Sequence, residues 1–446
     1  MSKSLSRREV LKQTTLATGL VTLGGVWAEP SSAQKKPKSP NSKLNIACVG
    51  AGGQGASDIQ QVSHENIIAL CDVDERRAAN TFNQYSDVRK FQDFREMLDK
   101  MHKEIDAVVV SIPDHNHAVV TSLALHMDKH VYCQKPLTHN VSEARYITEL
   151  AKKKPKLATQ MGTQGHAFEG YFRLVEIIQK GVIGEVNEVH VWTDRPIWPQ
   201  GGKRPTQILL PPKTLNWEQW IGPAQMRLFH PSYLPFVWRG WWDFGTGALG
   251  DMACHLMDPA FWALELGSPS AVSAQTEGMT ADSYPTSSII RYEFPKKNSK
   301  DKKAVTTMIW YDGKNRPPQS LFGNDTVPKI DNGSLFVGTK GKLLIDHSGM
   351  PILLPKADFT NANLPTPYLK RSPGHYLQWI EACKSGSPTG SPFRYAGPMT
   401  EAILLGNVAM RTKRRIEWDA AKMICKKDEE ATAMIKPEYR DGWVLS

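Results

Sequence analysis

Residues 43–74 read KLNIACVGAGGQGASDIQQVSHENIIALCDVD, and this stretch decides the fold. The apolar run 44–49 is too short for a helix and too continuous for a half-exposed strand, so it predicts a strand buried on both faces. The run ends in a GxGxxG pattern formed by Gly50, Gly52 and Gly55. In this pattern the first glycine allows a tight turn, the second lets a pyrophosphate approach the backbone, and the third lets a helix pack on the strand.

A second apolar run, 67–71, ends at Asp72, 22 residues after Gly50. An acidic side chain at this distance can accept hydrogen bonds from an adenosine ribose. The helix expected near Gly55 would offer free N–H groups to the phosphates. We therefore expect a dinucleotide site, with Gly53 and Gln54 also in its loop. The alternative is an ordinary glycine-rich turn between a strand and a helix.

The alternation of strands and helices continues after this stretch. It predicts a doubly wound parallel sheet, with helices at 75–85, 91–101 and 118–127 and strands at 107–112 and 130–133. Ligands of such sheets bind at the carboxyl ends of the strands. Two polar stretches lie there, PDHNH at 113–117 and QKP at 134–136.

These motifs resemble those of the Gfo/Idh/MocA oxidoreductases, a family named for glucose-fructose oxidoreductase and inositol dehydrogenase. The family pattern of a turn with proline, a histidine, and a strand followed by Glu-Lys-Pro is met by Pro113, His117 and Lys135 with Pro136. Gln134 departs from it, since the family usually has glutamate there and the amide lacks that charge. The resemblance implies an NAD(P)-binding Rossmann domain at 43–162, with Pro113, His117, Gln134 and Lys135 at the cofactor.

The remainder, 163–446, predicts an α+β domain with a largely antiparallel open sheet. Runs of strand-forming residues lie at 188–193, 271–275, 288–294, 304–311 and 334–345. The segment 194–216 is rich in proline and glycine and lacks periodicity, which is typical of a functional or mobile loop. The resemblance implies that this domain binds substrate and supports a homo-oligomer, a dimer or a tetramer.

The stretch 238–266, WRGWWDFGTGALGDMACHLMDPAFWALEL, is the most informative part of this second domain. Its glycines predict a flexible approach to a helix that starts near Asp251. Asp251 and His255 are four residues apart and therefore share one helix face. The resemblance gives His255 the role of proton acceptor beside Asp251, facing Lys135 of the other domain. The alternative is that Asp251 caps the helix and His255 is a hydrogen-bonded core residue.

Tryptophans and hydrogen-bonding side chains cluster around this stretch in the sequence. Flat rings suit the C–H faces of sugars, and polar neighbours suit their hydroxyls. We expect at least half of the tryptophans to pack in the core instead. The candidates for substrate binding are Gln164, His166, Arg195, Trp198, Arg239, Trp242, Asp243 and His255. We expect no metal site, because none of the six cysteines forms a CxxC or zinc-ligand spacing.

The first 33 residues are typical of a twin-arginine export signal. Arg7 and Arg8 precede a mildly apolar run, and small residues at 31–33 suit a signal peptidase. The run is too short for a stable membrane span. We expect a signal at 1–33, a linker at 34–42, recognition by the twin-arginine machinery and a soluble periplasmic protein without a stable membrane anchor. The alternative is a chance arginine pair before an amphipathic helix.

The formal net charge of +10 does not indicate a nucleic-acid partner. Residues 1–43 hold eight lysines and arginines against two glutamates, so more than half of the basic excess lies in the signal and linker. The rest of the chain carries a formal charge of only +4. We therefore expect no nucleic acid among its partners.

These features predict an exported NAD(P)-dependent oxidoreductase that acts on a hydroxyl of a sugar, glycoside or polyol. Because no cofactor pool is expected outside the cytoplasm, we expect a tightly held NAD and a redox-neutral cycle. Asp72 favours NAD, whereas Arg76 and Arg77 could accommodate the 2′-phosphate of NADP. One alternative is an NAD-dependent glycosidase or lyase that works by transient oxidation to a keto sugar. Another is a non-catalytic sugar-binding protein.

Overall fold

A computed structural model describes residues 42–297, 299–436 and 438–445. The expected export signal and all of the expected linker except Ser42 lie outside these residues. Residues 43–446 form one unit, and both sheets of the protein belong to it. No helix among the described residues combines the length and the apolar character needed to cross a membrane.

The first sheet has six parallel strands among the described residues, in the order β3-β2-β1-β4-β5-β6. The strand order reverses between β1 and β4. In doubly wound sheets, such a reversal leaves a crevice at the carboxyl ends of the two strands, and ligands bind there. The strands are β1 (Asn45–Val49), β2 (Asn66–Cys71), β3 (Arg89–Phe91), β4 (Ala107–Val110), β5 (His130–Cys133) and β6 (Thr159–Met161).

Helices cover both faces of this sheet. Ile46 and Cys48 of β1 pack with α1, α2 and α10, while Ala47 and Val49 pack with α3, α4 and α5. The prediction of a strand buried on both faces, and of a doubly wound parallel sheet, is confirmed. The covering helices are α1 (Gln54–Val62), α2 (Glu75–Gln84), α3 (Phe94–Met101), α4 (His117–His126), α5 (Val141–Lys153) and α10 (His375–Ser385).

The second sheet has nine strands among the described residues, in the order β13-β12-β11-β7-β10-β9-β8-β14-β15. Its pairs are antiparallel except for β7 with β10, so the prediction of a largely antiparallel sheet is confirmed. The strands are β7 (Val186–Trp192), β8 (Ala271–Glu277), β9 (Ser287–Pro295), β10 (Val305–Tyr311), β11 (Gly333–Gly338), β12 (Lys342–Asp346), β13 (Ile352–Leu354), β14 (Ile416–Asp419) and β15 (Ile424–Cys425).

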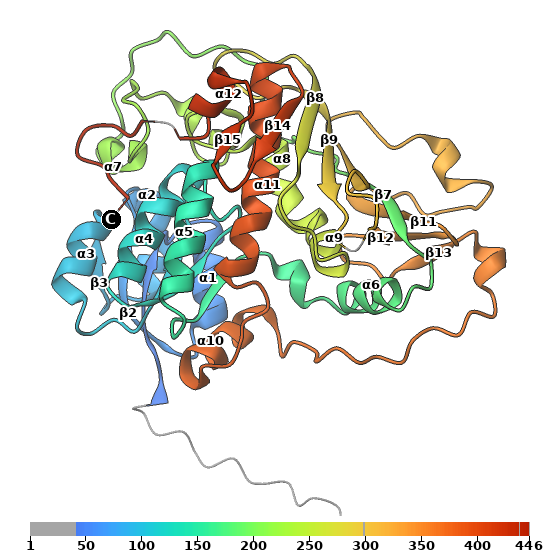
Figure 1. Cartoon of the computed structure of the whole chain (residues 1–446). Coiled ribbons are helices and arrows are strands. Elements are labelled where there is room, and N and C mark those ends of the chain that lie inside the picture. Colours follow the sequence, from blue (N-terminus) through green and yellow to red (C-terminus); the bar gives the residue numbers. More distant parts are fainter. Residues whose placement is uncertain (1–41, 298, 437, 446) are drawn as a thin grey trace, which may run out of the picture. The chain divides into compact units, whose positions relative to one another are not determined.

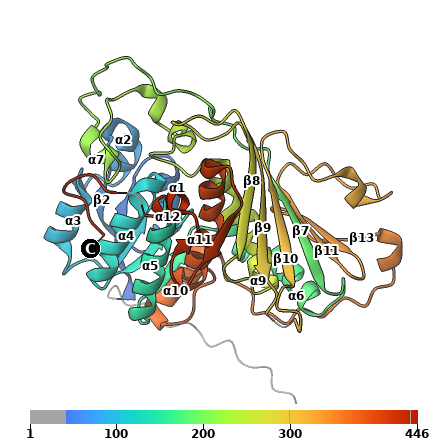
Figure 2. The ribbon, with the colours of Figure 1, turned by 45° about the horizontal axis from the view of Figure 1, so that its top comes forward.

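Helices α6, α8, α9 and α11 pack on one face of this second sheet, and Figure 2 shows α6 and α9 against it. Helix α11 also contacts α5, so it lies between the two sheets and joins their cores (Figure 1). The remaining helices of the described residues are α6 (Glu169–Gln179), α7 (Trp217–Ile221), α8 (Gly247–Leu256), α9 (Asp258–Ala263), α11 (Phe393–Thr412) and α12 (Glu429–Ala433). Short 3-10 turns are η3 (Asp114–Asn116), η4 (Gln164–Ala167), η5 (Pro231–Tyr233), η6 (Val237–Gly240), η7 (Gln319–Phe322) and η8 (Lys356–Phe359).

Helix α8 begins at Gly247, four residues before the predicted start at Asp251. A Cβ on Gly247 would lie 2.4 Å from the ring of Tyr284, and one on Gly250 would lie 2.2 Å from the side chain of Thr246. These glycines therefore let the helix pack closely instead of interrupting it. Asp251 lies inside the helix, so the alternative that it caps the helix start is wrong.

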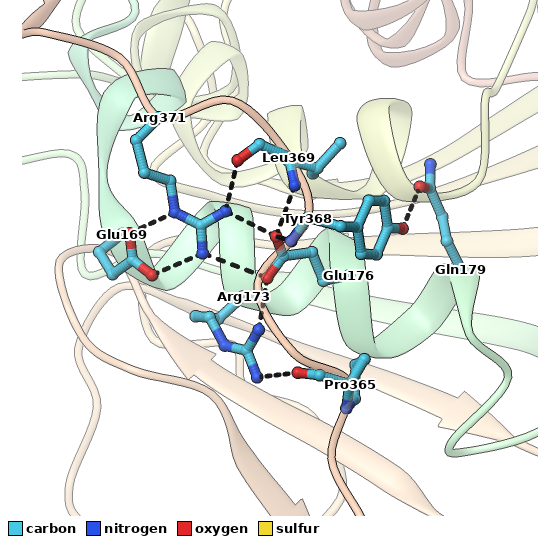
Figure 3. Close-up of polar contacts among 8 residues, drawn as sticks. All are labelled: Glu169, Arg173, Glu176, Gln179, Pro365, Tyr368, Leu369 and Arg371. Atoms are coloured by element: carbon cyan, nitrogen blue, oxygen red, sulfur yellow. Dashed lines mark hydrogen bonds and ion pairs between the residues drawn. The ribbon is translucent and has the colours of Figure 1, made fainter. Parts of the chain in front are cut away.

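The segment 363–372 crosses α6 and is fastened there by one buried carboxylate, that of Glu176 (Figure 3). Glu176 accepts hydrogen bonds from the backbone N–H groups of Tyr368 (2.7 Å) and Leu369 (2.9 Å). It also accepts from the guanidinium groups of Arg371 (2.6 Å) and Arg173 (2.5 Å). These hydrogen bonds lower the pKa of Glu176 to about 2, against the desolvation that burial imposes.

Candidate active site

A cavity of about 600 Å³ lies at the carboxyl ends of β1, β4 and β5. Its wall includes the glycine loop after β1 and the residues that follow β4 and β5. The opposite wall comes from the second part of the chain, namely the loop residues 195–198, the segment 234–239 and helix α8. Residues that lie far apart in the sequence thus meet in one cavity.

The glycine loop is too tightly packed for side chains. Gly50 has a φ of +94°, and a Cβ there would lie 2.1 Å from the carbonyl oxygen of Ser111. A Cβ on Gly55 would lie 2.3 Å from the carbonyl oxygen of Gly50. The first glycine therefore allows the turn and the third lets α1 pack on it, as the GxGxxG pattern predicts. Helix α1 begins at Gln54, directly after Gly53.

Asp72 lies at the end of β2 and lines the cavity. Its carboxylate accepts hydrogen bonds from the N–H groups of Ala51 (2.8 Å), Gly52 (3.2 Å) and Asp74 (2.9 Å). Burial raises its pKa, although these backbone hydrogen bonds act in the opposite direction. Asp72 thus braces the glycine loop, a role that the sequence pattern did not predict.

The side chains of Lys135 and Asp251 both line the cavity and contact each other. The Nζ atom of Lys135 lies 2.7 Å from Oδ1 of Asp251 and 2.9 Å from the backbone oxygen of the same residue. The Nε–H group of Arg239 donates to the same Oδ1 at 2.9 Å. Burial opposes the charge of Asp251, but the two cations hold its pKa well below the usual range. Asp251 is therefore an anion that orients two cations.

His255 lies one helical turn after Asp251 and lines the same cavity as Lys135. Its Nδ1 atom is buried and has no hydrogen-bond partner among the described residues. Burial, and next the charges of Lys135 and His347, hold the pKa of His255 well below its ordinary value. The imidazole is therefore neutral near pH 7 and able to accept a proton.

The structure brings most of the predicted site residues to this cavity. Those that line it are Gly50, Gly52, Gly53, Gln54, Asp72, Pro113, Gln134, Lys135, Gln164, Arg195, Trp198, Arg239, Asp251 and His255. Gly55, His117, His166, Trp242 and Asp243 do not line it.

His117 lies behind the wall instead of in it. Its Nδ1 and Nε2 atoms lie 2.7 Å from the carbonyl oxygens of Pro136 and Ile112, respectively. The ring therefore ties the turn after β4 to the turn after β5. The resemblance implied that His117 lies at the cofactor. Its side chain instead lies outside the cavity lining and supports two turns that form the wall.

Three of the predicted substrate residues have structural partners elsewhere. Nδ1 of His166 lies 2.9 Å from the buried carboxylate of Asp258, and its ring stacks on Trp262. The ring of Trp242 packs on Tyr284, and its N–H group donates to the carbonyl oxygen of Thr280. Asp243 forms ion pairs with Arg204 and Arg227.

Several cavity residues were missed. Asp114 and Asn116 belong to the polar stretch after β4, so the rule that ligands bind at strand ends could have found them. The apolar residues 234–236 lie in a segment without periodicity, and no sequence signal marked them. Side chains of the wall that were not predicted at the site include Asp114, Asn116, Gln219, Leu234, Pro235 and Phe236.

The residues present fit a dinucleotide. Gly52, Gly53 and the start of α1 form a backbone cradle, and a Cβ on Gly53 would lie 2.7 Å from the guanidinium of Arg77. A helix N-terminus and a nearby cation both favour phosphate groups. In the described ranges, no three or more His, Cys, Asp or Glu side chains are grouped to hold a metal ion.

This geometry defines a protein with a dinucleotide-binding Rossmann domain, and comparison with protein families agrees. The family model "Oxidoreductase family, NAD-binding Rossmann fold" matches residues 44–162. The companion model "Oxidoreductase family, C-terminal alpha/beta domain" matches residues 176–315. The chain belongs to the Gfo/Idh/MocA oxidoreductase family.

Curated relatives include two inositol 2-dehydrogenases. The enzyme of Salmonella paratyphi B is 28% identical over 152 residues, which cover 33% of this chain and 45% of the relative. The enzyme of Arthrobacter sp. is 28% identical over 162 residues, covering 35% and 48%. The chain thus spans about half the length of the curated relatives that it matches.

Solved structures share the fold over nearly their whole length. The WlbA dehydrogenase from Chromobacterium violaceum, in complex with NADH and UDP-GlcNAcA, has a TM-score of 0.58 and 15% identity, covering 87% of this chain and 99% of that one. The aldose-aldose oxidoreductase from Caulobacter crescentus, complexed with glycerol, has a TM-score of 0.55 and 16% identity, covering 84% and 100%. At these identities the likeness shows the fold alone.

Proposed function

We propose that this chain is an NAD-dependent oxidoreductase that acts on a hydroxyl of a sugar, glycoside or polyol. One observation carries the proposal, namely that Lys135 and His255 line the same cavity as the glycine loop. The relatives named inositol 2-dehydrogenase and the neighbour complexed with a sugar nucleotide support a polyhydroxylated substrate.

In this proposal one residue accepts the proton of the substrate and another donates a hydrogen bond to the oxygen that remains. The neutral imidazole of His255 takes the proton of the substrate hydroxyl, because its lowered pKa keeps it available as a base. An ammonium group has three N–H donors. Those of Lys135 make two hydrogen bonds to Asp251 within the described residues, which leaves one for a substrate oxygen. This donor stabilises the developing alkoxide.

Asp251 orients this arrangement without taking part in proton transfer. Its carboxylate holds Lys135 from one side and Arg239 from the other, and its lowered pKa keeps it ionised. NAD, when bound, supplies the hydride acceptor, and the glycine loop with Gln54, Asp72 and Gln134 would hold it. Gln164, Arg195 and Trp198 complete the wall on the substrate side.

The finer parts of the proposal concern the location and the cofactor. The paired arginines and small residues of positions 1–33 support export through the twin-arginine pathway to the periplasm. An exported dehydrogenase would need to retain its NAD through many turnovers, so we propose tight binding and a redox-neutral cycle. NADP is the alternative cofactor, since Arg77 lies beside the glycine loop.

A second candidate function is a glycosidase that oxidises its substrate transiently and then reduces it again. It is favoured by an apolar collar at the cavity, formed by Ile197, Trp198, Leu234, Pro235, Phe236 and Trp238. Phe236 has a φ of +67° and is 43% exposed, a strained conformation that is uncommon for a bulky residue. A collar of this kind suits the ring of an aglycone beyond the sugar that reacts.

Native mass spectrometry of purified protein tests the main proposal together with its cofactor. Protein made without added NAD should carry a mass of about one dinucleotide per chain. Incubation with free sugars, polyols and aryl glycosides should yield an oxidised product or, in the second candidate, a released aglycone without net NADH. A chain that binds NAD but changes none of these compounds would contradict the proposal, and a chain that needs added NAD would contradict tight binding.

A further inference from the structure

A buried carboxylate lies directly beneath the cavity floor, on α1, the first helix of the described residues. Asp58 of α1 has no exposed surface. It accepts hydrogen bonds from Ser111 Oγ (2.5 Å), Tyr376 Oη (2.7 Å), Gln54 Nε2 (2.8 Å) and Gln134 Nε2 (2.9 Å). Four side chains from four segments therefore converge on one buried carboxyl group.

Three of these four donors also line the cavity, namely Gln54, Ser111 and Gln134. The fourth, Tyr376 of α10, accepts a hydrogen bond from Gln164 of the cavity wall at 3.2 Å. Asp58 therefore links residues that follow β1, β4 and β5 with α10, which lies more than 200 residues later in the sequence than β6. A buried network with all its members hydrogen-bonded rigidifies the structure around it.

The carboxylate also decides how the amide of Gln134 is turned. An ionised carboxylate only accepts hydrogen bonds, so the Nε2 side of the amide must face Asp58. The Oε1 atom then faces the other way and accepts the backbone N–H of Lys135 at 3.3 Å. Gly162 packs against the same amide, because a Cβ there would lie 2.6 Å from Oε1. Gln134 has little room to reorient.

We infer that Asp58 is a positioning residue for the active site. It acts through Gln134, fixing the amide oxygen toward the backbone from which Lys135 extends into the cavity. An amide at position 134 is required because a glutamate there would put two carboxylates in contact. The role of Lys135 in this inference rests on the proposed function, whereas the pairing of Asp58 with Gln134 does not.

The test exchanges the acid and the amide between the two positions. Gln134→Glu alone places like charges within hydrogen-bond distance, so the dissociation constant for NADH should rise at least tenfold. Asp58→Asn alone lets the amide of Gln134 turn, so kcat should fall about tenfold while KM for the sugar changes little. In the double variant Asp58→Asn/Gln134→Glu the hydrogen bond is restored with donor and acceptor reversed, and both values should return to within threefold of the wild type.

Exchange of the bound nucleotide for added NADH is measured by fluorescence without any sugar, and the melting temperature is measured on the protein as purified. Asp312→Asn is the matched control, because Asp312 is a buried carboxylate of the second sheet that accepts from Ser288 and Trp310 and does not line the cavity. It should lower the melting temperature and leave NADH binding unchanged.

Two results would overturn the inference. In one, the single variants bind NADH and turn over like the wild type; in the other, the double variant is no better than the worse single variant. A wild type that binds NADH but oxidises no sugar would instead contradict the proposed function, and the binding measurements would still decide the pairing.

Discussion

Asp251 is poorly suited to be the base of this site, because its carboxylate is already paired with two cations. Lys135 and Arg239 both contact its Oδ1 atom and hold its pKa well below the usual range. His255, four residues later on the same helix, has the opposite character, since burial and neighbouring cations keep it neutral. Both pKa values are lowered, but the carboxylate is paired with two cations, whereas Nδ1 of the neutral imidazole has no hydrogen-bond partner among the described residues. In the proposed mechanism Asp251 is therefore the orienting group and His255 the base.

Replacing Lys135 with methionine should abolish turnover and leave the cofactor site intact. Methionine keeps the length of the side chain but has no donor for an alkoxide, so we expect kcat to fall by at least ~100-fold. NADH binding measured by fluorescence should stay within threefold of the wild type. Lys152→Met is the control, because Lys152 is an exposed residue of α5 that pairs with Glu149. Near-normal turnover in Lys135→Met would remove Lys135 from the mechanism.

Asp114 makes stability depend on pH. Burial raises its pKa to about 6, from 3.8 for the ordinary side chain, although Thr246 donates a hydrogen bond to it. The folded carboxyl holds its proton more tightly than the unfolded one, so its contribution to stability is full below about pH 4 and is lost as the pH rises through about 6. The difference amounts to roughly 3 kcal/mol.

The variant Asp114→Asn should therefore lose less stability between pH 4 and pH 7 than the wild type. Urea unfolding at several pH values measures this difference. Part of the dependence should persist, because burial raises the pKa of Asp312 to about 6 as well. Asp99→Asn, at an exposed position, should behave like the wild type. Parallel curves for Asp114→Asn and the wild type would refute the assignment.

At the scale of elements, the pattern of apolar residues predicted the strands that are buried. The strands at 44–49 and 130–133 are buried runs, and their positions were confirmed. Strand β3 was missed because Arg89–Phe91 is short and largely exposed, and hence carries no apolar signal. The run 334–345 was predicted as one strand but forms β11 and β12, since Gly338 and Gly341 lie at the turn between them.

The segment 363–372 offers a test at the level of one element. Removing the charge of Glu176 leaves Arg371 and Arg173 without their buried partner, so Glu176→Gln should destabilise the fold by about 3 kcal/mol at pH 7. Chemical denaturation measures the loss. Because the pKa of Glu176 is lowered to about 2, the contribution is full above about pH 4.5 and is lost as the pH falls through about 2.

Glu169→Gln is the matched control for this segment. Glu169 pairs with the same Arg371, but its side chain is 51% exposed, so the loss should stay below about 1 kcal/mol. Equal losses in the two variants would show that burial of Glu176 contributes nothing.

At the scale of the whole unit 43–446, the sequence predicted the convergence of the site better than its surroundings. The rule for strand ends brought Lys135 to the glycine loop, and helical spacing put Asp251 and His255 on one face. The role of α11 could not be predicted, because packing between the two sheets depends on contacts across hundreds of residues. The division at residue 162 stays a prediction.

Helix α11 should make this unit unfold in one step. It contacts α5 on one side and β8 on the other, and Glu401 of α11 forms an ion pair with Arg145 of α5 at 2.8 Å. Calorimetry should therefore show one transition with equal calorimetric and van't Hoff enthalpies. Arg145→Ala should lower the midpoint without splitting the transition, whereas Lys152→Ala should leave it unchanged. Two separate transitions in the wild type would contradict this coupling.

The three-way contact of Lys135, Asp251 and Arg239 also has a consequence for the choice of buffer. Below about pH 6, where Asp114 takes up a proton, the two cations outnumber the ionised carboxylate near them by one. Small anions such as chloride, acetate or sulfate would then be drawn to Lys135, where the proposed mechanism places the alkoxide. The rate measured in acidic salt solutions would then be too low, and lowering the salt concentration would restore it.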